Sequence, residues 1–403
     1  MIEVQNSTPL LVGWYDPLKQ DVAGLRTTEI KGLWRWWART FIAGALYDLG
    51  LLRGEESSNT VLKPSEDSIT TISYFVGKIL GLGYVGRIDK KEESEASRFT
   101  LYVEGRVKPK QLSSKLQRIR LLGIKEKKKG VKEERWIEGV EEGQKFRIFV
   151  KKRISKDPEA EGLALKILLL ALQLSGIGKG SRRGLGSLDI CSLDACSELP
   201  FTKDIKSLID DVYSSCCEIV KKYRNDVKTS SAIRESKCSD FPPLPLISKG
   251  SIYNVKISQI IRVRNIKFEA LHNFFVRSER CRVLYGDPRC YDDIRCERVA
   301  WFLGLPRQQK NEKNTGYFTE DVPRRASPVI VSYHTDKNVF GDGGFITILV
   351  SGDWPKKILW RGEGMKRPIN INCESIVNAL NIVFNEFDQY LRKLKAVTEV
   401  IWP

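Results

Sequence analysis

The chain has 403 residues and a formal net charge of +17. Its hydrophobic fraction of 41% and its 16 prolines are typical of a folded protein with two or three domains rather than of a disordered chain. The excess of positive charge favours a polyanionic partner, and nucleic acid is the commonest one. Charge alone does not decide this, because a lysine-rich composition also occurs in proteins that bind no nucleic acid.

No membrane segment, metal site or cofactor site is expected. The N-terminus lacks a basic start followed by an apolar run, so it does not resemble a signal peptide. The apolar run 163–174 is shorter than the ~20 residues of a membrane span, and we expect a cytoplasmic protein. Nine cysteines, an odd number, predict free thiols in the core rather than a disulfide framework. The cysteine spacings and the two histidines match neither a zinc site nor a Ser-His-Asp triad.

In chain order, the first half predicts a strand, a helix, strands, a helix and a strand. The strands are expected at 7–13, 69–76, 97–104, 142–150 and 186–191, and the helices at 31–49 and 159–174. This order is the β-α-β-β-α-β pattern of a ferredoxin-like unit. The charge-dense segments 89–95 and 125–135 predict surface loops, and no role can be attached to the charged insertions 86–98 and 123–135.

The second half predicts a similar unit. Helices are expected at 200–225, 291–302 and 373–394, strands at 251–264, 327–333 and 344–350, and a rigid connector at 241–246. The last two strands are predicted to form a hairpin. We therefore expect an α+β protein with two tandem ferredoxin-like (RRM-like) domains, antiparallel sheets and insertions. The predicted domains are 1–197 and 198–403.

The first predicted helix carries a basic stripe. Lys31, Arg35 and Arg39 recur at i, i+4 and i+8, which places them on one face. Three like charges in a row repel one another unless an anion lies beside them, which favours an anionic partner at this face; the alternative is a solvated face. The neighbouring tryptophans are expected to pack in the core.

The stretch 174–188 combines glycine with positive charge. Glycine can adopt positive φ and permits close approach of a partner to the backbone, and Lys179, Arg182 and Arg183 add charge at the same place. The spacing matches neither a P-loop nor a dinucleotide fingerprint. The alternative is a helix C-cap followed by a flexible turn. The glycines of this predicted close-approach loop are Gly176, Gly178, Gly180, Gly184 and Gly186.

Two further arginines, Arg324 and Arg325, directly precede the predicted hairpin. Adjacent arginines at the start of a strand can bind phosphates with two hydrogen bonds each. They could equally pair with Glu320, Asp321 or another domain. Both alternatives stay open on the sequence alone.

Together these motifs resemble the RAMP superfamily of CRISPR-associated proteins, whose hallmark is a glycine-rich loop like 176–186 after the second helix. More narrowly, Thr8-Pro-Leu, the block 30–37 and Arg324-Arg-Ala-Ser-Pro resemble the first-numbered RAMP subunit of the Cmr (type III-B) effector complex. The resemblance implies two ferredoxin-like domains and a position near the 3′ end of the CRISPR RNA. It also implies contacts with CRISPR RNA, target RNA and other RAMP subunits, and no target cleavage by this subunit. By motif match, the resemblance implies these RNA contacts: Lys31, Arg35, Arg39, Lys179, Arg182, Arg183, Arg324 and Arg325.

The leading interpretation is a non-catalytic RNA-binding subunit in antiviral defence. Its basic groups would bind phosphates with little sequence preference, and Trp14 is either a stacking ring or a core residue. A metal-independent CRISPR RNA endoribonuclease is the first alternative, with His272 and His334 as the candidate acid and base. A purely architectural subunit is the second alternative, and it predicts no RNA affinity for the isolated chain.

Overall fold

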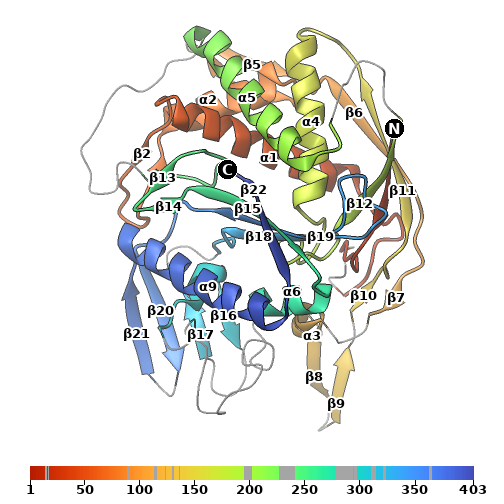
Figure 1. Ribbon diagram of the computed structural model, residues 1–403, viewed down its shortest axis with the longest axis vertical. Coiled ribbons are helices and arrows are strands. Elements are labelled where there is room, and N and C mark those ends of the chain that lie inside the picture. The colour runs from red at the N-terminus through yellow and green to blue at the C-terminus, as the bar shows by residue number, and fades with distance from the viewer. Residues whose placement is uncertain are drawn as a thin grey trace.

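The computed structural model shows a mixed helix and strand protein with antiparallel sheets (Figure 1). The structure describes residues 1–13, 16, 18–88, 91–112, 116–122, 124–128, 131–135, 137–194, 202–226, 241–276, 294, 297–309, 315–320, 324–362 and 365–403.

The first sheet is antiparallel, with the strand order β12-β1-β11-β6. Its strands are β1 (Ile2–Asn6), β6 (Phe99–Glu104), β11 (Lys145–Lys152) and β12 (Leu188–Leu193), and its two long helices are α1 (Thr27–Asp48) and α4 (Pro158–Leu174). Helix α4 begins at Asp157, whose carboxylate accepts hydrogen bonds from the backbone N–H groups of Glu159 and Ala160. This N-cap and the proline in the first turn explain why the helix starts where it does.

The second sheet has the order β18-β19-β15-β22 and is also antiparallel. It consists of β15 (Ser258–Arg264), β18 (Val329–His334), β19 (Gly343–Leu349) and β22 (Val397–Trp402), with α6 (Phe268–Val276) after its first strand and α9 (Cys373–Lys393) before its last. In both sheets the first and third strands in chain order lie in the middle.

Helices α1, α4 and α5 (Ile205–Tyr223) pack together, and α4 contacts β12 of the first sheet and β18 and β19 of the second. Figure 1 shows α6 and α9 on the other side of the second sheet. One hydrophobic core includes residues from both sheets and from these helices. Trp34 and Trp37 of α1 are fully buried in it, and their indole N–H groups donate to Ala164 O at 2.6 Å and Ser175 Oγ at 2.8 Å. The predicted core role of these two tryptophans is confirmed.

The remaining elements form a third sheet and several short pieces. The third sheet has the order β16-β17-β20-β21 and consists of β16 (Arg307–Gln309), β17 (Thr315–Phe318), β20 (Lys357–Gly362) and β21 (Met365–Asn370). The short pairs are β2 (Gly54–Glu55) with β3 (Lys63–Pro64), β4 (Tyr84–Ile88) with β5 (Lys91–Glu95), β7 (Lys110–Gln111) with β10 (Glu138–Gly139), β8 (Ile124–Lys128) with β9 (Val131–Arg135), and β13 (Ser251–Ile252) with β14 (Val255–Lys256). The other helices are α2 (Glu66–Tyr74), α3 (Gln117–Leu122) and the short turns η1 (Phe75–Ile79), η2 (Arg224–Asp226) and η3 (Ala300–Leu303).

Three predictions about elements are wrong. The expected strand 69–76 lies in α2 and η1, because Ser65 caps the helix through the backbone N–H of Ser68, and this signal outweighs the β-branched content. The strand expected at 7–13 is displaced to β1, and only isolated bridges form at Leu10, Leu11 and Gly13. The segments 89–95 and 125–135, expected as loops, contain strands of the hairpins β4–β5 and β8–β9.

Other predicted elements are confirmed within a few residues, namely α1, α4, α5, α9, β6, β11, β12 and the β18–β19 hairpin. The expected strand 251–264 is interrupted by a turn in which Tyr253 and Asn254 have positive φ. Cys373 is disulfide-bonded, which corrects the expectation of free thiols at this position. The predicted domain boundary at 197/198 lies outside the described residues. The same is true of most of residues 291–296, where the helix 291–302 is predicted to start. None of the helices in the described ranges is long and apolar enough to span a membrane.

Candidate nucleic-acid interface

The glycine-rich loop between α4 and β12 folds back on itself. Four of its glycines have positive φ: +83° at Gly178, +77° at Gly180, +82° at Gly184 and +69° at Gly186. A Cβ on Gly186 would lie 2.1 Å from the carbonyl oxygen of Ile177. The backbone N–H of Ile177 donates a hydrogen bond to Gly186 O at 2.9 Å. The glycines therefore permit close approach between parts of this chain.

The loop also joins the N-terminal segment to the second sheet. Thr8 Oγ1 donates to Gly184 O at 2.7 Å, and the Lys179 backbone N–H donates to Leu11 O at 2.8 Å. On the other side, the Val331 backbone N–H donates to Arg182 O at 3.2 Å. The Thr8-Pro-Leu motif and the glycine loop thus form one junction beside β18.

An open cavity of about 510 Å³ lies at this junction. Its walls come from the glycine loop, the start of α3, the segment 303–307 and the segment 324–327. Among the described residues, the lining contains six arginines and no carboxylate. The lining residues are Gln117, Arg118, Gly180, Ser181, Arg182, Arg183, Val276, Leu303, Gly304, Leu305, Pro306, Arg307, Arg324, Arg325, Ala326 and Ser327. We call this space the arginine cavity.

Arg182 links α1 to the segment before β18. Its guanidinium lies over the ring of Trp36, 4.8 Å from the ring centroid, and donates to Ser327 O at 2.9 Å. Burial lowers the pKa of Arg182 to about 10, and repulsion from Arg325 adds to this shift while Asp353 opposes it. An anion in the cavity would offset the cost of burying this charge.

Arg183 is held by protein groups of the second half. Its guanidinium donates to Ser327 Oγ at 3.2 Å and Val329 O at 3.4 Å, and also to Leu303 O. Its own carbonyl oxygen accepts a hydrogen bond from His272 Nδ1 at 2.7 Å. These contacts fix the position of the loop against β18.

The two arginines before β18 differ in their surroundings. Arg325 is only 7% exposed, donates to Asp353 Oδ1 at 2.6 Å and Ser351 Oγ at 3.0 Å, and lies over the ring of Trp354. Its guanidinium is therefore engaged inside the protein. Arg324 is exposed at the rim of the cavity, where its guanidinium can reach a ligand.

Arg118 and Arg307 complete the arginine set, and sequence reasoning missed both. Burial lowers the pKa of Arg118, and repulsion from Arg324 adds to the effect. Arg307 donates to Phe275 O at 3.0 Å. The sequence contains no motif that marks Arg118 as a site residue. It follows a polar segment without periodicity, and only the tertiary fold brings it to the loop.

Lys31, Arg35 and Arg39 do not line the arginine cavity. Arg35 donates to Gly83 O at 2.6 Å, and Arg39 is exposed. Burial lowers the pKa of Lys31, and repulsion from Arg35 and Arg153 adds to the shift. The structure thus forms a second basic surface on α1.

Lys179 lies against Gly13 and is also outside the cavity lining. Trp14 lies outside the described residues. Of the predicted RNA contacts, the structure therefore brings Arg182, Arg183, Arg324 and Arg325 together and leaves Lys179 beside them on the loop.

His272 is fully buried beneath the cavity. Its Nε2 accepts a hydrogen bond from the backbone N–H of Arg118 at 3.2 Å, so Nδ1 carries the proton that is donated to Arg183 O. Burial lowers the pKa of His272 to about 4, and the charges of Arg183 and Arg118 contribute. The ring is a neutral structural link at neutral pH.

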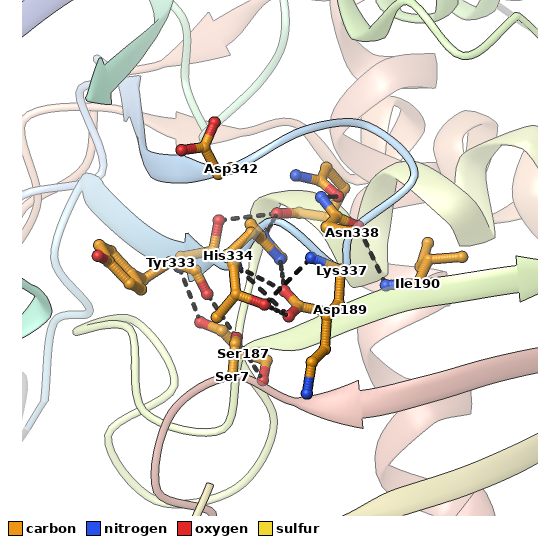
Figure 2. Close-up of polar contacts among 12 residues, drawn as sticks. Ser7, Ser187, Asp189, Ile190, Tyr333, His334, Lys337, Asn338 and Asp342 are labelled. Atoms are coloured by element: carbon orange, nitrogen blue, oxygen red, sulfur yellow. Dashed lines mark hydrogen bonds and ion pairs between the residues drawn. The ribbon is translucent and has the colours of Figure 1, made fainter. Parts of the chain in front are cut away.

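His334 lies in a buried polar network between β12 and β18, shown in Figure 2. Its Nδ1 lies 3.1 Å from Asp189 Oδ1 and its Nε2 2.7 Å from Gln173 O. Asn338 Oδ1 accepts from the backbone N–H of Ile190 at 3.0 Å in the same network. Within the described ranges, no group of three or more His, Cys, Asp or Glu side chains could hold a metal ion.

Residues 6–189, a little under half of the chain, match the model of the RAMP superfamily. The matched range contains α1, β6, β11, α4 and the glycine loop, and it ends at the start of β12. A search of curated proteins found no match.

Two solved structures with a similar fold are chains of the type III-B Cmr-beta complex. One, bound to cognate target RNA and AMPPnP in the presence of single-stranded DNA, is 13% identical, with a TM-score of 0.51 and coverage of 97% of this chain and 98% of that one. Another, bound to cognate target RNA, is 13% identical, with a TM-score of 0.50 and coverage of 96% and 98%. The apo form of Cmr1 from Pyrococcus furiosus is 16% identical, with a TM-score of 0.48 and coverage of 100% and 98%.

Proposed function

We propose that the chain is a non-catalytic RNA-binding RAMP subunit of a type III-B CRISPR effector complex. In this proposal it acts in the cytoplasm in antiviral defence and contacts CRISPR RNA and target RNA near the 3′ end of the CRISPR RNA, as well as neighbouring RAMP subunits. The observation that carries the proposal is the arginine cavity, whose lining, among the residues that the structure describes, contains six arginines and no carboxylate. The similarity to chains of Cmr-beta complexes solved with target RNA supports it.

The electrostatics of the cavity favour a phosphate ligand. Burial lowers the pKa values of Arg118 and Arg182, and repulsion from Arg324 and Arg325, respectively, adds to these shifts. Each of the two positive charges is therefore held at a cost in free energy. A phosphodiester backbone would offset this cost at several arginines together, because each guanidinium can donate two parallel hydrogen bonds to phosphate oxygens. The cavity would then bind RNA largely independently of base sequence.

The same proposal includes two ferredoxin-like units, divided at 197/198. The strand orders β12-β1-β11-β6 and β18-β19-β15-β22 support two such units, with the division between the end of β12 at Leu193 and the start of β15 at Ser258. The strands of each sheet and its two helices follow one another along the chain as strand, helix, two strands, helix and strand, which is the order of the β-α-β-β-α-β motif.

A non-catalytic role is supported by the positions of the two histidines. His272 and His334 are 0% and 1% exposed, and the ring nitrogens of both lie within hydrogen-bond distance of protein groups. A general base needs to reach the proton that it removes, and neither ring reaches the cavity surface. We expect the purified chain to leave labelled CRISPR RNA intact.

The RNA-binding role is tested with the double variant Arg118→Ala/Arg324→Ala. Both side chains line the cavity, and removing two phosphate contacts is expected to lower the slope of log K against log salt by about 1.4 for single-stranded RNA. Fluorescence anisotropy with a labelled oligonucleotide at several salt concentrations measures this slope. The variant Arg392→Ala is the matched control, because Arg392 is a highly exposed arginine on α9.

Two results would contradict the proposal. An unchanged affinity and salt slope in the double variant would show that the cavity does not bind RNA. A wild-type chain without measurable RNA affinity would favour the architectural alternative. Each result counts only for a protein whose circular dichroism spectrum shows that it is folded.

A further inference from the structure

We propose that the outer face of the first sheet is a stacking platform for single-stranded RNA, centred on Tyr102 and Phe149. This inference rests on the proposed function only in that RNA is the ligand. Neither ring lines the arginine cavity, so the platform is a second, separate site.

The strand register places the two rings side by side on one face. Tyr102 of β6 pairs with Phe149 of β11, and their ring centroids lie 6.0 Å apart at an interplanar angle of 41°. Tyr102 is 58% exposed, whereas Ile148, next to Phe149, is fully buried. Because side chains alternate across a strand, Tyr102 and Phe149 point away from the core and from α1 and α4.

The neighbouring rows on this face carry polar and charged groups. Lys151 pairs with Thr100 on one side of the rings, and Arg147 pairs with Glu104 on the other. Successive rows on one face of a strand are about 7 Å apart. A base stacked on the rings would therefore have a cation within reach of the phosphate on either side of it.

The charge around the rings favours a polyanion. On this face β11 carries Lys145, Arg147 and Lys151, whereas Lys152 lies on the other face and pairs with Glu161 of α4 at 3.5 Å. Two carboxylates oppose these three cations: Glu3 of β1 and Glu104 of β6 flank Arg147 in the strand register, and Lys145 pairs with Glu3 at 3.2 Å. Arg147 forms an exposed ion pair with Glu104 at 2.9 Å, and such surface pairs are weak enough to exchange for phosphate.

These observations favour RNA over a protein partner. A stable protein interface buries about 800 Å² per partner and has an apolar centre. On this face the two rings are bordered by charged and hydroxyl side chains instead. Aromatic rings next to cations are the usual arrangement in proteins that bind single-stranded nucleic acid.

The test compares Tyr102→Ala with Tyr102→Phe in the full chain. Stacking of one base predicts that Tyr102→Ala weakens binding of a uridine-rich single-stranded RNA by about tenfold to a hundredfold, whereas Tyr102→Phe keeps the affinity. Tyr253→Ala is the matched control. Tyr253 is 52% exposed and packs against Phe241 with centroids 6.3 Å apart at 45°, but it lies in the turn between β13 and β14.

An abasic oligonucleotide separates the contribution of base stacking to the affinity from the contribution of charge. An abasic strand of equal length lacks the bases, so Tyr102→Ala should bind it like the wild-type chain, while Lys151→Ala should weaken both oligomers and lower the salt slope. Equal affinity of Tyr102→Ala and wild type for the uridine-rich RNA would overturn the platform, even if the arginine-cavity variant loses affinity. If Tyr102→Ala binds the uridine-rich RNA like the wild-type chain but no longer joins an assembled effector complex, the face is a protein contact. This result would also overturn the platform. If the wild-type chain binds no RNA, both this inference and the proposed function fail.

Discussion

We expect the stability of the fold to fall with acid through His272. The ring is neutral in the folded chain because burial lowers its pKa from 6.5 to about 4. Between these two pH values the unfolded chain takes up a proton that the folded chain does not, so the free energy of unfolding decreases as the pH falls. The contribution is complete above pH 6.5 and amounts to about 3 kcal/mol.

The variant His272→Gln removes this titration but keeps a polar side chain at the position. Urea unfolding of wild type and variant at a series of pH values from 7.5 to 4 gives the difference in free energy of unfolding as a function of pH. We expect the wild-type curve to fall more steeply by about 3 kcal/mol over this range. The comparison uses the slopes, so a constant loss of stability in the variant does not affect it.

A second measurement reports the titration directly. The chain has two histidines, so isotope-labelled histidine gives two sets of ring signals in NMR spectra, and the variant identifies the set of His272. These signals should stay those of the neutral Nδ1–H tautomer down to about pH 5. Parallel unfolding curves for the two proteins, or a midpoint near 6.5 for His272, would refute the reasoning.

Two further predictions concern packing and buried charge. Gly186→Ala should lower the free energy of unfolding by about 2–5 kcal/mol, because its φ is +69° and its Cβ would lie 2.1 Å from a carbonyl oxygen; Gly32→Ala, in open space on α1, should raise it by about 0.5–1 kcal/mol. Arg325→Met should lower the free energy of unfolding by about 2 kcal/mol because it leaves the carboxylate of Asp353 without its cation, whereas Arg392→Met, at an exposed pair on α9, should lower it by less than about 0.5 kcal/mol. Urea unfolding measures all four changes, and equal effects in either pair would contradict the corresponding prediction.

The long helices and most paired strands could be predicted because their signals are local. Helix α4 has a continuous apolar pattern and an Asp-Pro start, and the β18–β19 pair has two apolar runs joined by a turn-rich segment. Helix α2 was mistaken for a strand because β-branched residues fill its sequence, while its start signal is only one serine followed by two acidic residues.

The arginine cavity could be predicted only in part. The sequence places Arg182 beside Arg183 and Arg324 beside Arg325, but it does not show which guanidinium faces outward. That depends on distant groups such as Asp353 and Ser327. The positive φ of the loop glycines was predictable from residue type. That they approach Ile177, Leu185 and Leu11 of the same chain depends on the tertiary fold.

The walls of the arginine cavity come from both halves of the chain, with Ser181 and Arg182 on one side and Arg307 and Arg324 on the other. A ligand that contacts both walls adds its binding free energy to the interactions that hold the two halves together. Under the proposed function, RNA occupancy and resistance to unfolding are therefore linked quantities. A melting temperature measured with and without RNA would report the occupancy of the cavity, and in an assembled complex the bound RNA would act as an additional structural element of the subunit.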